Sequence, residues 1–213
     1  MCGFIRPESK KRSLSLSRMM NTLEDNELKG ILSSFSCKHD ADIQNFLHNR
    51  AIDFERLLKS RTYLIVSDEQ LQNPNISFND LTIYGYISLA IKVFTVPEKT
   101  SNRQRQQLDG FSAKEHGKQI SNFPCYWIGQ LARNSNVPKK SISGAELLNF
   151  AYKMIGEAVK LVAGRNILVE CHNNEKLIKF YLDNGFYKIS QVPDESQTMI
   201  QMIRRIEFGG YAS

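Results

Sequence analysis

Residues 125–189 decide the fold, and they read CYWIGQLARNSNVPKKSISGAELLNFAYKMIGEAVKLVAGRNILVECHNNEKLIKFYLDNGFYKI. Hydrophobic periodicity divides this segment into alternating strands and helices. The expected elements are a strand at 126–132, a basic turn at 137–143, a helix at 144–161, a strand at 167–170, a helix that begins at Asn173 or Asn174, and a short strand that ends at Ile189. This order predicts an α/β or α+β domain around a mixed sheet.

The composition fits one folded domain with a basic surface. A chain of 213 residues with 41% apolar residues can bury a single sizeable core, so its length does not require a second domain. Lys and Arg number 28 against 22 Asp and Glu, and the resulting charge of +6 would favour a nucleic acid or a phosphorylated cofactor as partner. A mildly basic surface is equally common in proteins that bind neither.

The cysteines indicate neither a metal site nor a disulfide framework. Cys2, Cys37, Cys125 and Cys171 are widely spaced and form no CxxC pair, which fits reduced thiols in a cytosolic protein. No apolar run approaches the roughly 18 residues of a membrane helix, and no secretory signal stands at the start. We therefore expect a cytoplasmic protein without a metal and without membrane contact.

Residues 1–20 have the composition of a disordered or non-native tail. They carry five basic residues and repeated serines, and their few apolar side chains share no helical or strand period. The segment also weakly resembles an organelle transit peptide, but a tail, or an upstream start before a true start near Met19 or Met20, fits better. The folded domain is expected to cover residues 21–210.

Two helices should open this domain. Leucines and isoleucines give one apolar face over residues 23–32 and another, together with Phe46 and Phe54, over residues 43–58. Asp40 or Asp42 is the expected N-cap of the second helix.

Strands should follow. β-branched and aromatic residues indicate a strand at 62–67 and a long bent strand at 81–96, in which Gly85 marks a bulge. A buried helix is the competing interpretation of residues 81–96. At the other end of the chain, residues 191–195 read as a turn, and residues 198–208 as a last strand that pairs with the strand ending at Ile189.

Residues 97–124 form a polar insertion rich in Lys, Arg and Gln. A segment of this length without secondary structure is unusual inside a compact domain unless it is a lid or a binding element. We expect it to contain a short helix at 103–108 and to border the site of an acceptor substrate.

The basic turn of the opening segment has the chemistry of an anion site. It joins a strand to a helix N-terminus, where unpaired amides and the positive end of the helix dipole point outward together. Lys139 and Lys140 add positive charge that suits a diphosphate. Many strand-turn-helix units bind nothing, and lysines in a turn are often merely solvated.

The second helix of the segment carries a more specific pattern. Asn174 is followed by Leu177, by the pair Phe180 and Tyr181, and by a closing Gly-Phe turn at 185–186. In this pattern the chain resembles the GNAT superfamily of acetyl-CoA-dependent N-acetyltransferases. Its phosphate loop matches less well, because Lys139 stands at the first position of the loop and Ile142 replaces a glycine that is free to adopt positive φ.

The resemblance implies a mixed, mostly antiparallel sheet flanked by helices, with a split between two strands that admits the pantetheine arm of acetyl-CoA. It also implies which residues contact the coenzyme. Along the pantetheine arm they are Gln130, Leu131, Ala132 and Arg133, and a main-chain N–H near Leu131 is the expected oxyanion donor. At the diphosphate they are Lys139, Lys140, Ser141, Ile142, Ser143, Gly144 and Ala145. Asn174 is expected either to contact the arm or to cap a helix.

The same resemblance assigns the catalytic groups. Tyr181 matches the general acid that protonates the departing thiolate of coenzyme A. Glu170 is the expected base for the acceptor amine, with His172 and His116 as alternatives. Cys171 and Cys125 are expected to be packing residues, because direct transfer in a ternary complex needs no acyl-enzyme.

The leading functional expectation is therefore an N-acetyltransferase acting on a primary amine. Two alternatives remain open. One is a toxin-like enzyme that acetylates the α-amino group of aminoacyl-tRNA, which the charge of +6 and the polar insertion favour. The other is a catalytically silent GNAT-like binding module. The sequence leaves open the acceptor, the acyl chain and whether the chain forms a homodimer.

Overall fold

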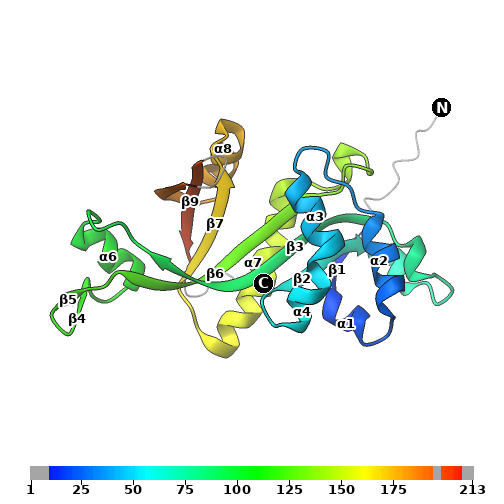
Figure 1. The fold of residues 1–213 in the computed structure, drawn as a ribbon, viewed down its shortest axis with the longest axis horizontal. Coiled ribbons are helices and arrows are strands. Elements are labelled where there is room, and N and C mark those ends of the chain that lie inside the picture. The colour runs from blue at the N-terminus through cyan, green and yellow to red at the C-terminus, as the bar shows by residue number, and fades with distance from the viewer. Residues whose placement is uncertain (1–9, 194–197, 208–213) are drawn as a thin grey trace. The chain divides into compact units, whose positions relative to one another are not determined.

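The computed structural model describes residues 10–193 and 198–207 (Figure 1). The chain forms two compact units, where the sequence indicated one domain. The first unit consists of the residues up to Ser88 together with Gln130–Phe150, and the second of Leu89–Gly129 together with the residues from Ala151 onward. None of the helices in these described ranges is both long and apolar enough to cross a membrane.

Seven strands form the main sheet in the order β1-β2-β3-β6-β7-β9-β8. Their bounds are β1 Lys11–Ser15, β2 Arg61–Ser67, β3 Ile83–Thr95, β6 Asn122–Arg133, β7 Asn166–His172, β8 Tyr187–Pro193 and β9 Thr198–Arg205. The pairs β1 with β2, β7 with β9, and β8 with β9 are antiparallel, whereas β6 and β7 are parallel. This mixed, mostly antiparallel sheet flanked by helices confirms the expected fold class.

The helices are α1 Leu16–Met20, α2 Asp25–Ser33, α3 Ala41–Asn49, α4 Ala51–Arg56, α5 Asp68–Gln72, α6 Asn102–Asp109, α7 Gly144–Val162 and α8 Glu175–Asp183, with short 3₁₀ turns at Phe78–Asp80 (η1) and Lys139–Ser141 (η2). The sequence pattern predicted helices α2, α6, α7 and α8 and the region of α3 and α4, but not the short helices α1 and α5. Asp40 is the N-cap of α3, because its carboxylate accepts hydrogen bonds from the amides of Asp42 and Ile43.

The apolar face predicted over residues 43–58 lies on two helices instead of one, and the prediction is wrong for Leu57 and Leu58. Arg50, with φ −123° and ψ −25°, separates α3 from α4, and α4 ends at Arg56. Leu58 then adopts a left-handed backbone with φ 55°, so Leu57 and Leu58 are exposed rather than part of the apolar face.

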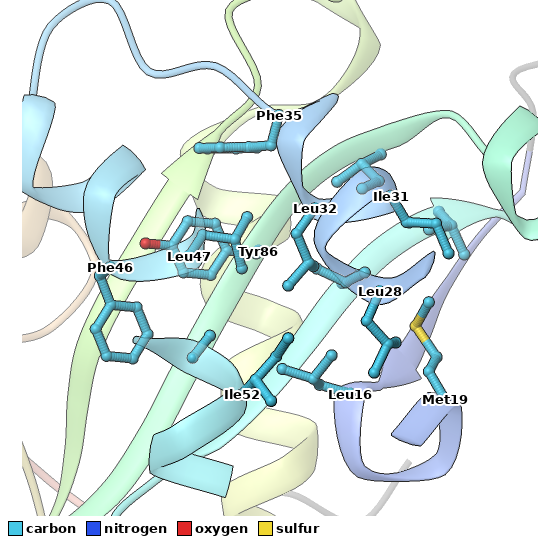
Figure 2. Packing of buried hydrophobic residues seen from close by; sticks show 14 of the residues in the cluster. Leu16, Met19, Leu28, Ile31, Leu32, Phe35, Phe46, Leu47, Ile52 and Tyr86 are labelled. Atoms are coloured by element: carbon cyan, nitrogen blue, oxygen red, sulfur yellow. The ribbon is translucent and has the colours of Figure 1, made fainter. Parts of the chain in front are cut away.

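The core of the first unit is built by helices α1–α4 on β2 and β3 (Figure 2). Leu16 and Met19 of α1 are fully buried there, beside Leu28 and Leu32 of α2. Tyr86 of β3 is also buried and donates a hydrogen bond of 2.6 Å to the carbonyl of Ile43.

The expectation that residues 1–20 form a disordered or non-native tail is therefore wrong for residues 11–20. Lys11–Ser15 pairs with β2 along its whole length, from Lys11 opposite Ser67 to Ser15 opposite Tyr63. The polar composition hid this strand because its partner β2 lies about fifty residues away in the sequence. The buried side chains next to it, Leu16 and Met19, belong to α1 and not to the strand. Residues 1–9 lie outside the described residues.

Gly85 of β3 marks a close approach between two parts of the chain. A Cβ at this position would lie 2.6 Å from the carbonyl oxygen of Ala132 on β6 and 2.9 Å from the side chain of Leu147 on α7. The glycine thus lets β6 and α7 approach β3 within the first unit. The sequence singled out this glycine as a bulge, whereas its requirement here is steric.

Replacing Gly85 by alanine should destabilise the fold by about 1–3 kcal/mol, because the backbone of β6 cannot move aside without shifting the strand. The matched control is Gly30→Ala in α2, where a Cβ would meet nothing within 4 Å. That substitution should stabilise the helix by about 0.5–1 kcal/mol. Thermal unfolding of the two variants should shift in opposite directions, and equal shifts would contradict the steric account.

The polar insertion is an ordered part of the second unit. Its expected helix is α6, whose N-terminus carries a capping box of Ser101 and Gln104, and a short hairpin follows with β4 at Lys114–Glu115 and β5 at Lys118–Gln119. Leu108 of α6 is buried in an apolar cluster with Phe94, Phe123 and Leu168, among others. Because β6 begins at Asn122, the insertion is shorter than predicted.

Arg105 holds this insertion together. Only 2% of the residue is exposed, and its guanidinium donates hydrogen bonds to four backbone carbonyls. These belong to Pro97, Glu98, Thr100 and Ile120, at 3.1, 3.0, 3.1 and 2.6 Å. A single side chain therefore satisfies the carbonyls of both ends of the insertion.

Arg105→Met should lower the free energy of unfolding by at least about 2 kcal/mol, because it removes four hydrogen bonds at once and each contributes roughly 0.5–1.5 kcal/mol. Arg103→Met, on the exposed side of the same helix, should change it by no more than about 0.5 kcal/mol. Urea unfolding would measure both, and limited proteolysis should show faster cleavage within residues 97–121 of the first variant only. Equal stability of the two variants would rule out the role given to Arg105.

The end of the chain confirms one prediction and corrects another. The last strand pairs with the strand that contains Ile189, as expected. The predicted turn at 191–195 is wrong for residues 191–193, which continue β8 as far as Pro193 opposite Thr198. Residues 194–197 and Phe208 lie outside the described residues.

Candidate functional site

In the second unit, the sheet opens between β6 and β7. The parallel register runs from Cys125 opposite Asn166 to Ile128 opposite Val169 and ends there. Gly129 and Glu170, both described and next in register, are not paired, while β7 stays paired with β9 as far as His172. The split that the resemblance implied therefore begins at Glu170.

Successive side chains of β7 point to opposite faces of the sheet at this opening. Cys171 is buried and lies close enough to Tyr181 of α8 for its charge to affect that hydroxyl. Glu170 and His172 must therefore lie on the other face. A group that passes through the opening would have Tyr181 on one side and Glu170 on the other.

Tyr181 is held in a closely packed aromatic environment. Its ring meets Phe180 and Phe186 edge to face, with ring centroids 5.0 and 5.3 Å apart. Burial raises the pKa of Tyr181, and the neighbouring Cys171 and Tyr152 raise it further. The phenol is therefore protonated at neutral pH, which is the form that a general acid requires.

Local chemistry explains why α8 starts and ends where it does. Asn174 is its N-cap, and the side-chain oxygen accepts from the amides of Lys176 at 3.0 Å and Leu177 at 3.2 Å. Gly185, with φ 82°, allows the chain to turn back so that the amide of Phe186 reaches the carbonyl of Tyr181 at 3.0 Å. The motif of the resemblance is thus the frame that places Tyr181, and the contact of Asn174 with the coenzyme stays a prediction.

Glu170 is engaged on both of its carboxylate oxygens. The ammonium of Lys92 lies 2.5 Å from Oε2, and the side-chain amide of Gln201 donates to Oε1 at 2.8 Å. Lys92 also lies over the indole ring of Trp127, 4.5 Å from its centroid. None of these three residues was predicted from the sequence, although a lysine inside the apolar run of β3 and the single tryptophan of the chain were the available signals.

The other residues considered for the base lie in different places. His172 follows Glu170 on the same face of β7, whereas His116 occupies the exposed turn of the hairpin between β4 and β5, with φ 49°. Burial raises the pKa of the Cys171 thiol to about 11 and that of Cys125 to about 12, so both are protonated at neutral pH.

In the first unit, the predicted phosphate loop has its own geometry. Lys139–Ser141 forms the turn η2, and both lysines are exposed. Ile142 adopts an extended backbone, with φ −153° and ψ 138°, and its side chain is completely buried. The isoleucine therefore fits without strain where the family has glycine, because its backbone never enters the positive-φ region.

The N-terminus of α7 already holds a carboxylate. Ser143 and Glu146 form a capping box, in which the Ser143 amide donates to Glu146 Oε2 at 2.7 Å and the Glu146 amide donates to Ser143 Oγ at 3.1 Å. Lys11 of β1 pairs with Glu146 Oε1 at 3.2 Å. These contacts lower the pKa of Glu146, the amide of Ser143 most of all.

The residues predicted along the coenzyme arm follow at the end of β6. Gln130 and Leu131 are partly exposed, Ala132 is buried, and Arg133 donates to the carbonyl of Lys139 at 2.8 Å, which ties the strand end to the turn. Coenzyme contacts of these residues, and of Ser141, Gly144 and Ala145, stay predictions.

A hollow of about 740 Å³ in the second unit is lined neither by the predicted catalytic residues nor by the residues predicted to contact the coenzyme. It is lined by Phe123, Lys160, Arg165 and Asn166, among others. Asn166 begins β7, whereas Glu170 and the opening lie near the other end of the strand. The hollow is therefore separate from the groups that carry the predicted chemistry.

The capping carboxylate makes the stability of the first unit depend on pH. Folding lowers the pKa of Glu146, so the ionised carboxylate adds to the free energy of unfolding at any pH above its unfolded-state pKa. This stabilisation is lost as the pH falls through the pKa of the folded state. The stability difference between the wild type and Glu146→Gln should therefore shrink between neutral pH and about pH 3. Chemical denaturation at several pH values measures it, and a constant difference would contradict the cap.

Solved structures with a similar fold include a bacterial toxin and the toxin AtaT. No protein-family model matches the chain, and no curated protein is similar to it in sequence. A tyrosine-to-phenylalanine mutant of KacT is similar with a TM-score of 0.59 and 19% identity, over 90% of this chain and 94% of that one. AtaT complexed with acetyl-methionyl-tRNAfMet has a TM-score of 0.59 and 18% identity, over 90% and 94%.

A third structure, AtaTR bound with acetyl-CoA, has a TM-score of 0.57 and 20% identity, over 90% of this chain and 92% of that one. At these identities the likeness establishes the fold. The GNAT-like architecture that the sequence predicted is confirmed.

Proposed function

We propose that this chain, which has the GNAT-type fold of toxins such as AtaT, is an acetyl-CoA-dependent N-acetyltransferase whose acceptor is the α-amino group of an aminoacyl-tRNA. The observation that carries the proposal is the opening of the sheet after Ile128 and Val169. It puts a protonated tyrosine on one face and a fixed carboxylate on the other. Transfer of an acyl group to an amine needs a general acid and a base in this relation.

The donor set of the first unit suits the diphosphate of coenzyme A. The Ser143 amide already donates a hydrogen bond to an anionic oxygen, Oε2 of Glu146. This carboxylate oxygen stands in for a phosphate oxygen of the coenzyme. Lys139 and Lys140 are exposed beside it and would contribute charge. The coenzyme, when bound, would supply an activated acetyl group as a thioester.

Each residue of the second unit then has one task. Tyr181 would give its proton to the thiolate sulfur as the carbon–sulfur bond breaks, and its aromatic contacts fix the hydroxyl for this role. Glu170 would take a proton from the acceptor nitrogen, which requires Oε2 to part from Lys92. In the first unit, backbone amides near Leu131 would stabilise negative charge on the carbonyl oxygen.

Two observations favour aminoacyl-tRNA over a small amine as the acceptor. AtaT, which has this fold, was solved with acetyl-methionyl-tRNAfMet. The insertion is basic on its surface, where Lys99, Arg103, Lys114 and Lys118 are exposed and ready to contact phosphates. These residues would hold the nucleic acid, and binding should weaken steeply as the salt concentration rises.

Tyr181→Phe should reduce acetyl transfer to aminoacyl-tRNA by about 10²–10⁴-fold, because it removes the proton donor and keeps the ring packing. The matched control is Tyr187→Phe, since Tyr187 is an exposed tyrosine of β8, and its activity should match the wild type. Transfer is measured with radiolabelled acetyl-CoA, and coenzyme binding by thermal shift should be unchanged in both variants.

Two results would overturn the proposal in different ways. Full activity of Tyr181→Phe would remove the acid role. Coenzyme binding without transfer to any aminoacyl-tRNA would remove the acceptor and would favour another amine or a silent binding module.

A further inference from the structure

Lys92, Glu170 and Trp127 form a site that is chemically an ammonium receptor. The ammonium of Lys92 meets a carboxylate oxygen at 2.5 Å and an indole face at 4.5 Å from its centroid. A carboxylate and an aromatic face are the two groups that proteins use to recognise a primary ammonium. In this structure a side chain of the chain itself fills the site.

The carboxylate, and the backbone that carries the indole ring, are held independently of Lys92. Glu170 and Gln201 are register partners on β7 and β9, and the amide of the largely buried Gln201 orients Oε1. Trp127 lies in the parallel pairing opposite Leu168. A Cβ at Gly129 would approach the indole within 3.4 Å, so the glycine leaves that part of the ring uncovered.

Lys92 is the least restrained member of the cluster. Its side chain is 37% exposed, against 16% for Glu170. Its long stem can swing to solvent, and another ammonium in its place keeps the charge of the site unchanged. Arg105 differs from Lys92 in this respect, because its buried guanidinium donates to four carbonyls that would lose their donor if it moved away.

The indole N–H adds a second argument for an adaptable site. Within the described residues, Nε1 of Trp127 is buried and makes no hydrogen bond. A small tilt of the ring to fit a ligand would therefore break no hydrogen bond. A purely structural tryptophan at this depth normally has a partner for this group.

We propose that Glu170, Trp127 and Gln201 recognise the ammonium of the acceptor, an α-amino ester, and that Lys92 occupies this place in the free protein until the acceptor displaces it. The inference rests on the proposed function and names how its site selects the amine. After displacement, the acceptor nitrogen gives one proton to Oε2 of Glu170, so that the ammonium becomes an amine and the carboxylate becomes a carboxylic acid. Lys92 is in this account a positioning residue, and it keeps the empty site neutral.

Trp127 makes the proposal directly measurable, because it is the only tryptophan in the chain. Methionine methyl ester, a primary α-amino ester without tRNA, is titrated into the full-length protein while indole emission is recorded. We expect a saturable change. N-acetylmethionine methyl ester, which lacks the ammonium, should give none, and this pair of ligands tests the wild type without any substitution.

Variants then separate the roles of the cluster. Lys92→Met removes the internal competitor, and if Lys92 fills the site about nine-tenths of the time the ester should bind about tenfold more tightly. Glu170→Gln should weaken binding at least about tenfold in either background. Lys188→Met, at an exposed lysine of β8, should leave binding unchanged. Thermal unfolding checks that each variant is folded.

Failure of this inference can be told from failure of the proposed function. Equal responses to the free and the acetylated ester, or unchanged affinity in Lys92→Met, would overturn the ammonium site even if acetyl transfer to aminoacyl-tRNA is observed. Saturable ester binding without any transfer would leave the site standing and remove the proposed reaction. Acetylation of Lys92 itself after incubation with acetyl-CoA, seen by peptide mass mapping, would make the lysine an acceptor and would also overturn the inference.

Discussion

The parallel pairing of β6 with β7, and its end at Ile128 and Val169, is the constraint on which the site depends. Up to that pair, ladder hydrogen bonds hold the two strands together. Beyond it, β9 is the one strand among the described residues that stays paired with β7, so the next residues of β7 can present one side chain to each face of an open sheet. This opening places the proposed acid and the proposed base on opposite faces of the sheet, without any direct contact between the two side chains.

Local sequence patterns predicted the parts of the site that local interactions build. Asn174, Gly185 and the aromatic pair at 180–181 specify a cap, a turn and a packed ring within twelve residues, so the helix and the burial of Tyr181 could be read directly. The strand β1 could not, because its stability comes from pairing with distant β2. Its polar composition fits an edge strand, which needs few apolar side chains.

The cluster around Glu170 could not be predicted from the sequence for the same reason. Lys92, Trp127 and Gln201 come from three strands that the sheet alone brings together. Arg105 was missed as well, since a buried arginine that pairs with backbone carbonyls has no sequence signature. Ile142 illustrates the opposite case, in which a departure from the family pattern proves harmless because the backbone there is extended.

Hydrogen exchange with and without coenzyme A tests the central claim most directly, because that claim concerns where the sheet opens. The account predicts that coenzyme slows amide exchange in residues 129–133 and 139–145, where strand and loop amides would pair with the arm and the diphosphate. Residues 125–128, already paired with β7, should change little. Slowed exchange confined to other parts of the chain, such as the hollow beside Arg165 and Asn166, would contradict the account.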